Sequence, residues 1–359
     1  MATQGTQAPL DEARLNDFMN KAIGDMGAAI NASLIALGDR LGLYKAMGSG
    51  EPMTSAEVAK KTGTAERYVR EWLNAQAAGG YVSYDAASGK YSLPAEQAFA
   101  LANEDSPVYL PGFFLAAVSV SHDIDKLLDA FRTGEGVGWH EHHHWLFEGT
   151  EKFFRPGYNA NLVSSWIPAL TSVEEKLKTG AKVADVGCGH GASTIIMAKA
   201  YPNSKFLGFD YHSGSIERAR TLAEQAGVGD RVEFEVASAK AYPGNNYDLI
   251  TFFDCLHDMG DPVGAAKHVF RSLVPGGTWM IVEPRAEDTI EGNLHPIGRI
   301  FYGASTMICT PASLSQEVGM ALGAQAGEKK IGEVVKAGGF PHFRRAAETP
   351  FNLVFEATR

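Results

Sequence analysis

The chain has 359 residues, of which 45% are hydrophobic and 21% are charged, and its formal net charge at pH 7 is −10. This length and composition predict a globular protein with room for two domains, and the negative charge argues against nucleic acid or an anionic membrane as a partner. The distant positions of Cys188, Cys255 and Cys309 argue against a disulfide framework and a thiolate zinc site.

The first residues have neither a basic segment nor an apolar segment of the kind found in a secretory signal. The longest apolar stretch, 112–120, is too short to span a bilayer. We therefore expect a cytoplasmic protein.

The N-terminal part has the pattern of a winged helix. Apolar residues recur every three or four positions along 10–47, which predicts a long helix whose stripe serves as core or as a dimer interface. Thr54 is a candidate N-cap for a second helix, and a third follows over 65–78. Two short β-prone runs, 81–84 and 90–93, then predict a hairpin.

Winged helices often bind DNA, but the charge of this one argues against it. Residues 1–94 contain nine Lys or Arg and ten Asp or Glu, and the candidate recognition helix carries as many acids as bases. A helix that reads a DNA groove needs a basic face to neutralise phosphates. We expect no nucleic-acid partner.

The segment 139–145 packs four histidines between two tryptophans, after a glycine-rich approach. Three interpretations remain open. His140 and His144 share a helical face and could bind a metal, although no partner ligands stand at a suitable spacing. The segment could be a surface helix start anchored by tryptophans. It could also be a lid whose histidines exchange protons with a substrate.

The most informative stretch is 182–191. An apolar strand pattern runs to Val186 and is followed by Gly187, Gly189 and Gly191 before an amphipathic helix, which predicts strand, tight turn and helix. Glycines permit the unusual backbone angles of such a turn and the close approach of a ligand. Asp210 ends the next apolar run, where a ribose-binding carboxylate stands in a nucleoside-binding unit.

These residues resemble class I S-adenosylmethionine-dependent methyltransferases. Two later stretches, 247–254 and 273–277, resemble the fourth strand and the turn before the fifth strand of that family. The N-terminal part resembles the dimerising winged helix of small-molecule O-methyltransferases. The resemblance implies a Rossmann-like α/β domain with a seven-stranded, mostly parallel sheet over 169–359, a helical linker and lid over 96–168, and a winged-helix, dimerising domain over 1–95.

The resemblance also implies roles for individual residues. Asp185 and the turn around Cys188 are expected to hold the methionine end of the cofactor, and Asp210 its ribose. Tyr211 and His212 are candidates to flank the adenine. Ser238 takes the place of an acid that the family commonly uses for the adenine amino group. The cofactor-binding residues predicted in this way are Asp185, Gly187, Cys188, Gly189, Asp210, Tyr211, His212, Ser238, Ala239 and Asp254.

The segment 253–261 resembles the one that supplies the general base of plant-type O-methyltransferases, and the match falls on His257. In many relatives a histidine here only packs over the cofactor. Asp258 could orient the imidazole or cap the next helix. The predicted catalytic residues are His257, Asp258, His142 and His143, and the predicted substrate-binding residues are Trp139, His140, His144, Tyr158 and Tyr302, the last from a long insertion that begins at Arg285.

We therefore predict an S-adenosylmethionine-dependent methyltransferase that acts on a small molecule as a homodimer. A weaker similarity to bacterial enzymes that methylate small thiols favours a thiol or sulfide acceptor, because a thiol is near its pKa at neutral pH and needs little help from a base. The alternatives are a small hydroxylated metabolite as acceptor, and a winged-helix transcriptional regulator with S-adenosylmethionine as its ligand.

Overall fold

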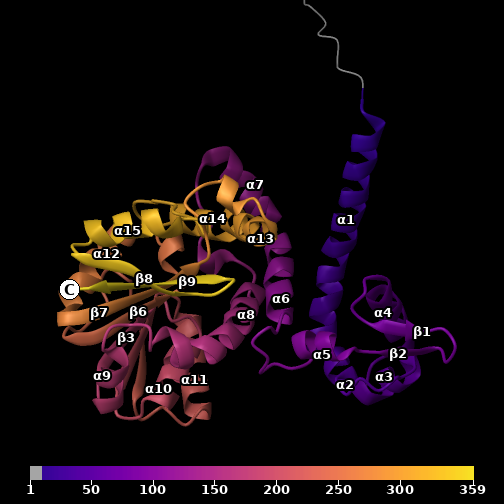
Figure 1. Cartoon of the computed structure of the whole chain (residues 1–359), viewed down its shortest axis with the longest axis horizontal. Helices are drawn as coiled ribbons and strands as arrows, with labels where there is room; N and C mark the ends of the chain where they lie inside the picture. Colours follow the sequence, from indigo (N-terminus) through magenta and orange to yellow (C-terminus); the bar gives the residue numbers. More distant parts are fainter. Residues whose placement is uncertain (1–9) are drawn as a thin grey trace, which may run out of the picture. The chain divides into compact units, whose positions relative to one another are not determined.

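The computed structural model describes residues 10–359. The chain forms two compact units, one extending to Val118 and the other covering Ser119–Arg359 (Figure 1). The first unit contains α1 (Glu12–Arg40), α2 (Leu43–Met47), α3 (Ser55–Thr62), α4 (Glu66–Ala78), β1 (Ser83–Asp85), β2 (Lys90–Ser92) and α5 (Ala95–Leu101), and α6 (Pro111–Ser119) ends at the boundary.

The first unit has the predicted order of helices and hairpin. Asp11 caps α1 by accepting from the backbone N–H groups of Ala13 and Arg14. The prediction of one long helix over 10–47 is wrong, because Gly42 takes a left-handed conformation (φ 68°) and separates α1 from α2. Thr54 and Glu57 form a capping box at the start of α3, as the predicted N-cap requires. The two hairpin strands pair antiparallel.

The second unit begins with helices and then forms the sheet. Its elements are η1 (Val120–Asp123), α7 (Ile124–Thr133), η2 (Trp139–Glu141), α8 (Trp145–Asn161), η3 (Leu162–Trp166), α9 (Val173–Thr179), β3 (Lys182–Val186), α10 (Ala192–Ala200), β4 (Lys205–Asp210), α11 (Ser213–Gln225), β5 (Val232–Val236), β6 (Tyr247–Phe253), η4 (Leu256–Asp258), α12 (Pro262–Ser272), β7 (Leu273–Pro284), η5 (Glu291–Asn293), α13 (Pro296–Ala304), η6 (Ser305–Cys309), α14 (Thr310–Leu314), α15 (Gly327–Ala337), β8 (His342–Glu348) and β9 (Asn352–Thr358).

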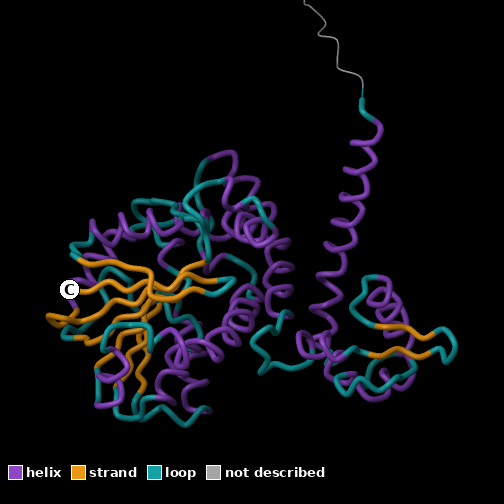
Figure 2. The backbone as a smooth tube through the Cα atoms, in the orientation of Figure 1, coloured by secondary structure: helices purple, strands orange, loops and turns teal. Residues whose placement is uncertain are grey.

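Seven strands form one sheet in the order β5-β4-β3-β6-β7-β9-β8 (Figure 2). The strands β3 to β7 run parallel, and β9 and β8 add an antiparallel pair at one edge. The predicted seven-stranded, mostly parallel sheet is confirmed.

Helices cover both faces of this sheet. The helices α9, α10 and α11 lie on one face, and α12 and α15 lie on the other (Figure 1). Each face has its own core: Val183, Phe206 and Met280 belong to one, and Ala184, Phe252 and Trp279 belong to the other. Strands buried on both faces explain the nearly continuous apolar runs in the sequence.

The topology determines where a ligand can bind. From β3 the chain builds outward through β4 to β5, and it then returns to place β6 on the other side of β3. Open α/β sheets bind ligands at the carboxyl ends of their strands, next to such a reversal. Across residues 10–359, no helix has both the length and the apolar character needed to cross a bilayer.

Candidate active site

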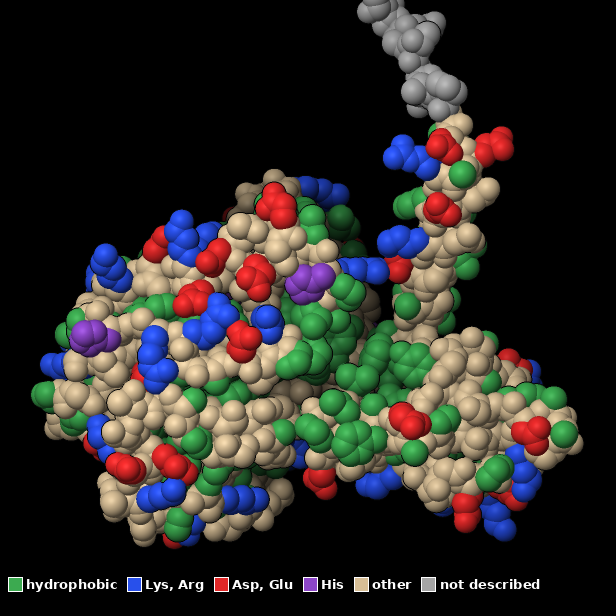
Figure 3. All heavy atoms as spheres, viewed as in Figure 1, with side chains coloured by type: hydrophobic (Ala, Val, Ile, Leu, Met, Phe, Trp, Pro, Cys, Tyr) green, Lys and Arg blue, Asp and Glu red, His purple; other side chains and the backbone are tan. Residues whose placement is uncertain are grey.

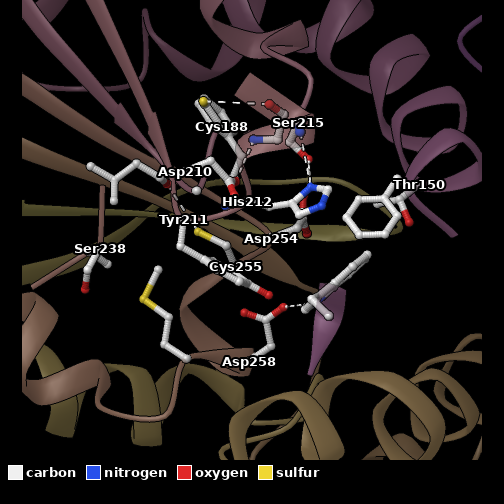
Figure 4. A pocket seen from close by; sticks show the side chains of 18 of the residues that line it. Thr150, Cys188, Asp210, Tyr211, His212, Ser215, Ser238, Asp254, Cys255 and Asp258 are labelled. Atoms are coloured by element: carbon white, nitrogen blue, oxygen red, sulfur yellow. Dashed lines mark hydrogen bonds between the residues drawn. The ribbon is translucent and has the colours of Figure 1, made fainter. Parts of the chain in front are cut away.

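A cavity of about 480 Å³ opens at the carboxyl ends of β3, β4, β5 and β6. This volume falls within the range of sites that enclose a cofactor-sized molecule. Helix α8 and the segments around Trp139 and Gln316 complete its wall. Figure 4 shows Asp210, Asp254 and Asp258 on different loops around the same space.

The glycine turn after β3 lines the cavity. Gly187 has φ 73°, and a Cβ there would lie 2.7 Å from the sulfur of Cys255. The N–H groups of Gly187 and Cys188 donate to the carbonyl of Phe209, at 2.8 and 3.0 Å, so the turn is fastened to β4. A side chain at Gly187 would therefore disturb the loops after two strands.

Asp185 does not reach the cavity, contrary to the expectation that it helps to hold a cofactor there. It is 1% exposed, and its carboxylate accepts from the hydroxyls of Ser193 (2.7 Å), Thr194 (2.6 Å) and Thr251 (3.0 Å). These bonds tie β3 to α10 and β6. Asp185 thus holds β3, which leads into the glycine turn, against α10 and β6. A buried carboxylate needs such hydrogen-bond partners.

Asp210 lines the cavity at the end of β4. Its Oδ2 accepts from the N–H of Gly189 at 3.0 Å, and its Oδ1 accepts from the N–H of His212 at 2.9 Å. Burial raises the pKa of Asp210, and the two backbone donors oppose this rise. Tyr211 and His212 line the adjoining wall, as does the predicted pair Ser238 and Ala239 after β5.

One face of α8 forms a large part of the wall. Five residues of α8 line the cavity and occupy positions i, i+3, i+4, i+7 and i+11 of one helical face: Phe147, Thr150, Glu151, Phe154 and Tyr158. The ring of Phe147 stacks on His212, with centroids 4.7 Å apart. Of these residues, only Tyr158 is predicted from the sequence to contact a ligand. The spacing was a readable sign of a helical face, but it does not indicate what that face covers.

His257 is buried behind the cavity rather than in its wall. Its Nδ1 lies 2.6 Å from Oε2 of Glu283, and its Nε2 lies 3.3 Å from the sulfur of Cys309. Burial alone would lower the pKa of His257, but the Glu283 carboxylate and Cys309 outweigh it and raise the pKa well above its ordinary value. Because Glu283 and Cys309 engage both ring nitrogens, the imidazole of His257 is not placed to accept a proton from a ligand in the cavity.

Asp258 does line the cavity. Its Oδ2 accepts from the indole N–H of Trp139 at 2.7 Å. Burial raises the pKa of Asp258 to about 6, while His257 and Trp139 favour the ionised form. Of the predicted pair, the carboxylate and not the imidazole therefore faces the cavity.

The structure divides the histidine-rich segment. Trp139 and His140 line the cavity, whereas His142, His143 and His144 do not. His142 is buried, with Nδ1 2.9 Å from Oδ2 of Asp123. The ring of His143 stacks on His122 at 4.3 Å, and His144 is exposed.

Tyr302 is half-buried on α13 and does not line the cavity. Three other residues of the insertion, which the sequence did not single out, line the cavity beyond α14: Ser315, Gln316 and Glu317. Among residues 10–359 no three His, Cys, Asp or Glu side chains are grouped so as to hold a metal ion.

Two protein families match separate parts of the chain. Residues 177–338 match a family described as a methyltransferase domain, and residues 28–103 match the Rv2258c-like winged helix-turn-helix domain. The predicted combination of these two modules is confirmed.

Curated relatives match over the methyltransferase region. The 27-O-demethylrifamycin SV methyltransferase of Amycolatopsis mediterranei is 36% identical over 28% of this chain and 38% of its own length. Phosphoethanolamine N-methyltransferase 1 of Arabidopsis thaliana is 36% identical over 29% of this chain and 21% of its own length. The chain thus matches well under half of the length of either relative.

Solved structures are similar over almost the whole chain. Human N-acetylserotonin methyltransferase in complex with S-adenosylmethionine has a TM-score of 0.69 at 17% identity, covering 100% of this chain and 99% of its own. Mitomycin 7-O-methyltransferase has a TM-score of 0.69 at 18% identity, covering 97% of this chain and 100% of its own. At this identity the likeness shows the fold, and it confirms the predicted class I methyltransferase fold.

Proposed function

Because residues 177–338 form a methyltransferase domain behind a winged-helix domain, we propose that this protein is an S-adenosylmethionine-dependent methyltransferase of small molecules. The observation that carries the proposal is the cavity at the carboxyl ends of β3 and β4, where the glycine turn and Asp210 meet. The cofactor supplies, when bound, a methyl group on a positively charged sulfur.

The cavity residues fit this cofactor. Asp210 can still accept from ribose hydroxyls, because a carboxylate offers about four lone-pair sites and the N–H groups of Gly189 and His212 occupy two of them. The aromatic walls of Tyr211 and of the stacked pair Phe147 and His212 suit a flat base. The backbone around Cys188 and Gly189 is open to the ligand, and no Cβ stands at Gly187. Ser238 and Ala239 would close the adenine end.

Methyl transfer requires the acceptor to lose a proton and to be aligned with the donor in the absence of water. We assign to Asp258 the role of the base that accepts this proton, because it is the member of the predicted catalytic pair that lines the cavity. His257 then acts behind it as a positioning residue, and its positive charge favours the ionised carboxylate. Trp139 and His140 would contact the acceptor from the lid segment.

The pKa of Asp258 favours a thiol or sulfide as the acceptor. A carboxylate with a pKa of about 6 takes a proton readily from a thiol, whose pKa is near about 8.5, and less readily from a phenol near about 10. The second candidate is O-methylation, which the names of the Amycolatopsis relative and of mitomycin 7-O-methyltransferase favour. Tyr158 in the cavity wall would contact an acceptor of either class.

A screen for cofactor consumption tests the function and the acceptor class together. We expect formation of S-adenosylhomocysteine with small thiols or hydrogen sulfide, measured against phenols and hydroxy acids at equal concentration. Turnover confined to phenols or hydroxy acids would overturn the thiol proposal and leave the methyltransferase proposal standing. The absence of cofactor binding would overturn both.

The N-terminal unit has features of a dimerisation module rather than of a DNA reader. On α4, Arg67 pairs with Glu71 (2.5 Å) and Arg70 with Glu66 (2.6 Å), so the arginines of this helix are already neutralised. Free basic side chains would be needed to hold phosphates. We therefore favour the enzyme over the transcriptional regulator.

Helix α1 presents an apolar stripe to solvent. The large side chains on it have exposed fractions between 44% and 69%, and they are Leu15 44%, Phe18 63%, Met19 45%, Ile23 60%, Met26 63%, Ile30 69% and Leu37 49%. Figure 3 shows hydrophobic side chains along this helix among charged ones. Contiguous apolar surface of this extent is unusual on a monomer, and we propose that a second copy of the chain covers it.

We expect the double variant Ile23→Glu, Ile30→Glu to halve the molar mass measured by light scattering, because both side chains would place charge inside the interface. Ala28 is exposed and lies on the opposite side of α1 by helical spacing, so Ala28→Glu is the matched control and should stay dimeric. A wild-type monomer would overturn the dimer proposal.

A further inference from the structure

The segment 313–323 comprises the end of α14 and the loop after it, and we call it the strap. Its backbone is strained. Val318 (φ 76°) and Ala321 (φ 49°) are non-glycine residues in the left-handed region, where a β-branched residue such as Val318 is seldom found. Such strain persists where the surroundings determine the conformation, often at a functional site. The contacts that hold the strap therefore indicate what its conformation serves.

The strap binds the backbone of residues 257–260, which we call the base segment because it contains Asp258. A short 3₁₀ turn has few hydrogen bonds of its own, so bonds from outside determine its path. Four consecutive carbonyl groups accept one bond each from the strap: that of His257 from the N–H of Gly323 (3.1 Å), that of Asp258 from the amide of Gln316 (3.0 Å), that of Met259 from the hydroxyl of Ser313 (2.8 Å) and that of Gly260 from the N–H of Met320 (2.9 Å).

Gln316 makes the contact with Asp258 itself. Its Nε2 donates to the carbonyl of Asp258 at 3.0 Å and to that of Ala312 at 2.9 Å, and its Oε1 accepts from the N–H of Gly260 at 3.1 Å. Gln316 also lines the cavity, but both of its amide hydrogens are used on backbone groups and neither is left for a methyl acceptor. These are the contacts of a residue that holds the base rather than the substrate.

Two glycines allow the strap to lie this close to its neighbours. A Cβ on Gly260 would lie 2.5 Å from the Cβ of Gln316, and a Cβ on Gly136, which leads into the lid segment, would lie 2.0 Å from the backbone nitrogen of Ser315. The strap thus packs against both the base segment and the approach to the lid. Because the lid supplies the indole N–H that binds the Asp258 carboxylate, both ends of that residue depend on contacts with the strap.

We propose that Gln316 is a positioning residue for methyl transfer, which fixes the backbone of Asp258 and so sets the angle at which the carboxylate meets the acceptor. This assignment rests on the proposed function, in which Asp258 is the base. A base acts only within hydrogen-bond reach of the proton that it takes, and a displacement of about 1 Å can lower a rate by about 100-fold. The strap thereby links the long insertion to the chemical step.

Gln316→Met tests this role, because it keeps the length of the side chain and removes its three hydrogen bonds. Gln316 is exposed, so the folded state should tolerate the change. With methanethiol as acceptor, we expect kcat for the formation of S-adenosylhomocysteine to fall by about 10-fold or more. The KM for the thiol and the affinity for S-adenosylhomocysteine should stay within about 2-fold of wild type, since the lost interaction acts on the transition state.

Gln325→Met is the matched control. The Gln325 amide also donates to backbone carbonyls, those of Arg285 and Ala324, but this residue does not line the cavity and does not contact the base segment. Its replacement should leave kcat within about 2-fold of wild type. A loss in Gln325→Met equal to that in Gln316→Met would show general damage to the insertion and would contradict a specific role for Gln316.

Two measurements show whether the effect passes through Asp258. In the Asp258→Asn background, Gln316→Met should lower kcat no further, since no carboxylate is left to position. In the otherwise wild-type protein, a loosened strap admits water to the carboxylate, and burial is the largest cause that raises its pKa, so the inflection of kcat should move to lower pH. The other groups that act on this carboxylate are retained in the variant: His257 of η4, Trp139 of η2, Glu283 of β7 and Asp210 of β4.

Gly260→Ala reaches the same contact from the other side. Its methyl group would push the Gln316 side chain away, so kcat should fall while KM is spared. A raised KM with unchanged kcat in Gln316→Met would assign the residue to acceptor binding instead. Unchanged kcat, or losses that multiply in the double variant with Asp258→Asn, would overturn the positioning role. A wild-type protein that does not bind S-adenosylhomocysteine would overturn the proposed function itself.

Discussion

Replacing Asp258 by asparagine is expected to lower kcat by about 10²-fold or more, because general-base assistance is typically of that size, and to leave the affinity for S-adenosylhomocysteine within about 2-fold. The amide keeps an oxygen for the indole N–H of Trp139, which donates to Asp258 at 2.7 Å, so the lid contact should persist. Turnover at saturating substrate and a calorimetric titration measure the two quantities separately.

The pH dependence has a definite sign. A base acts only in its unprotonated form, and the pKa of Asp258 is about 6, so kcat should rise from pH 5 to 7 and then level off. Asp258→Asn should abolish this rise. For a thiol acceptor its residual activity should grow at higher pH, as thiolate forms unaided. A hydroxyl acceptor should show no such rescue below pH 9.

Trp139→Phe is the matched control. It keeps an aromatic ring in the wall but removes the N–H that favours the ionised carboxylate, so the inflection should move to higher pH without disappearing. Full turnover in Asp258→Asn together with its loss in His257→Gln would contradict our assignment. It would return the role of the base to the imidazole that the sequence first suggested.

The predicted residues that line the cavity come from short, continuous pieces of chain. The strand, the turn at Gly187 and Asp210 after the next strand follow from spacing alone, because parallel strands bring their carboxyl ends to one edge. Ser238 reached the same edge for the same reason. Such local patterns need no knowledge of side-chain packing.

The parts that sequence reasoning missed depend on orientation. His257 and Asp258 are adjacent in a short 3₁₀ turn, and only the packing of Glu283 and Cys309 around the imidazole decides which of the pair faces the cavity. Asp185 likewise seemed free to bind a ligand until its hydroxyl partners were known.

The histidine-rich segment shows the same limit. Its residues lie next to each other, but His142 turns inward to Asp123 while His140 reaches the cavity. The partner of His142 lies 19 residues earlier in the chain, and no periodicity within the segment points to it. The role of α8 in the cavity wall could not be predicted either, because the sequence does not show what this helix covers.

Asp210→Ala is expected to weaken S-adenosylhomocysteine and 5′-methylthioadenosine alike, by about 10²-fold, since each loses two hydrogen bonds to a charged group worth roughly 1.5 kcal/mol apiece. Both ligands contain the ribose, so an equal loss of affinity for the two is what a ribose-binding carboxylate predicts.

Part of the loss of affinity would come from altered loops, because Asp210 also joins Gly189 to His212. Thermal unfolding of the ligand-free variant measures that part. Selective loss of S-adenosylhomocysteine in Asp210→Ala would assign Asp210 to the amino-acid end of the cofactor, which 5′-methylthioadenosine lacks, and not to the ribose. Retained affinity for both ligands would remove Asp210 from the site.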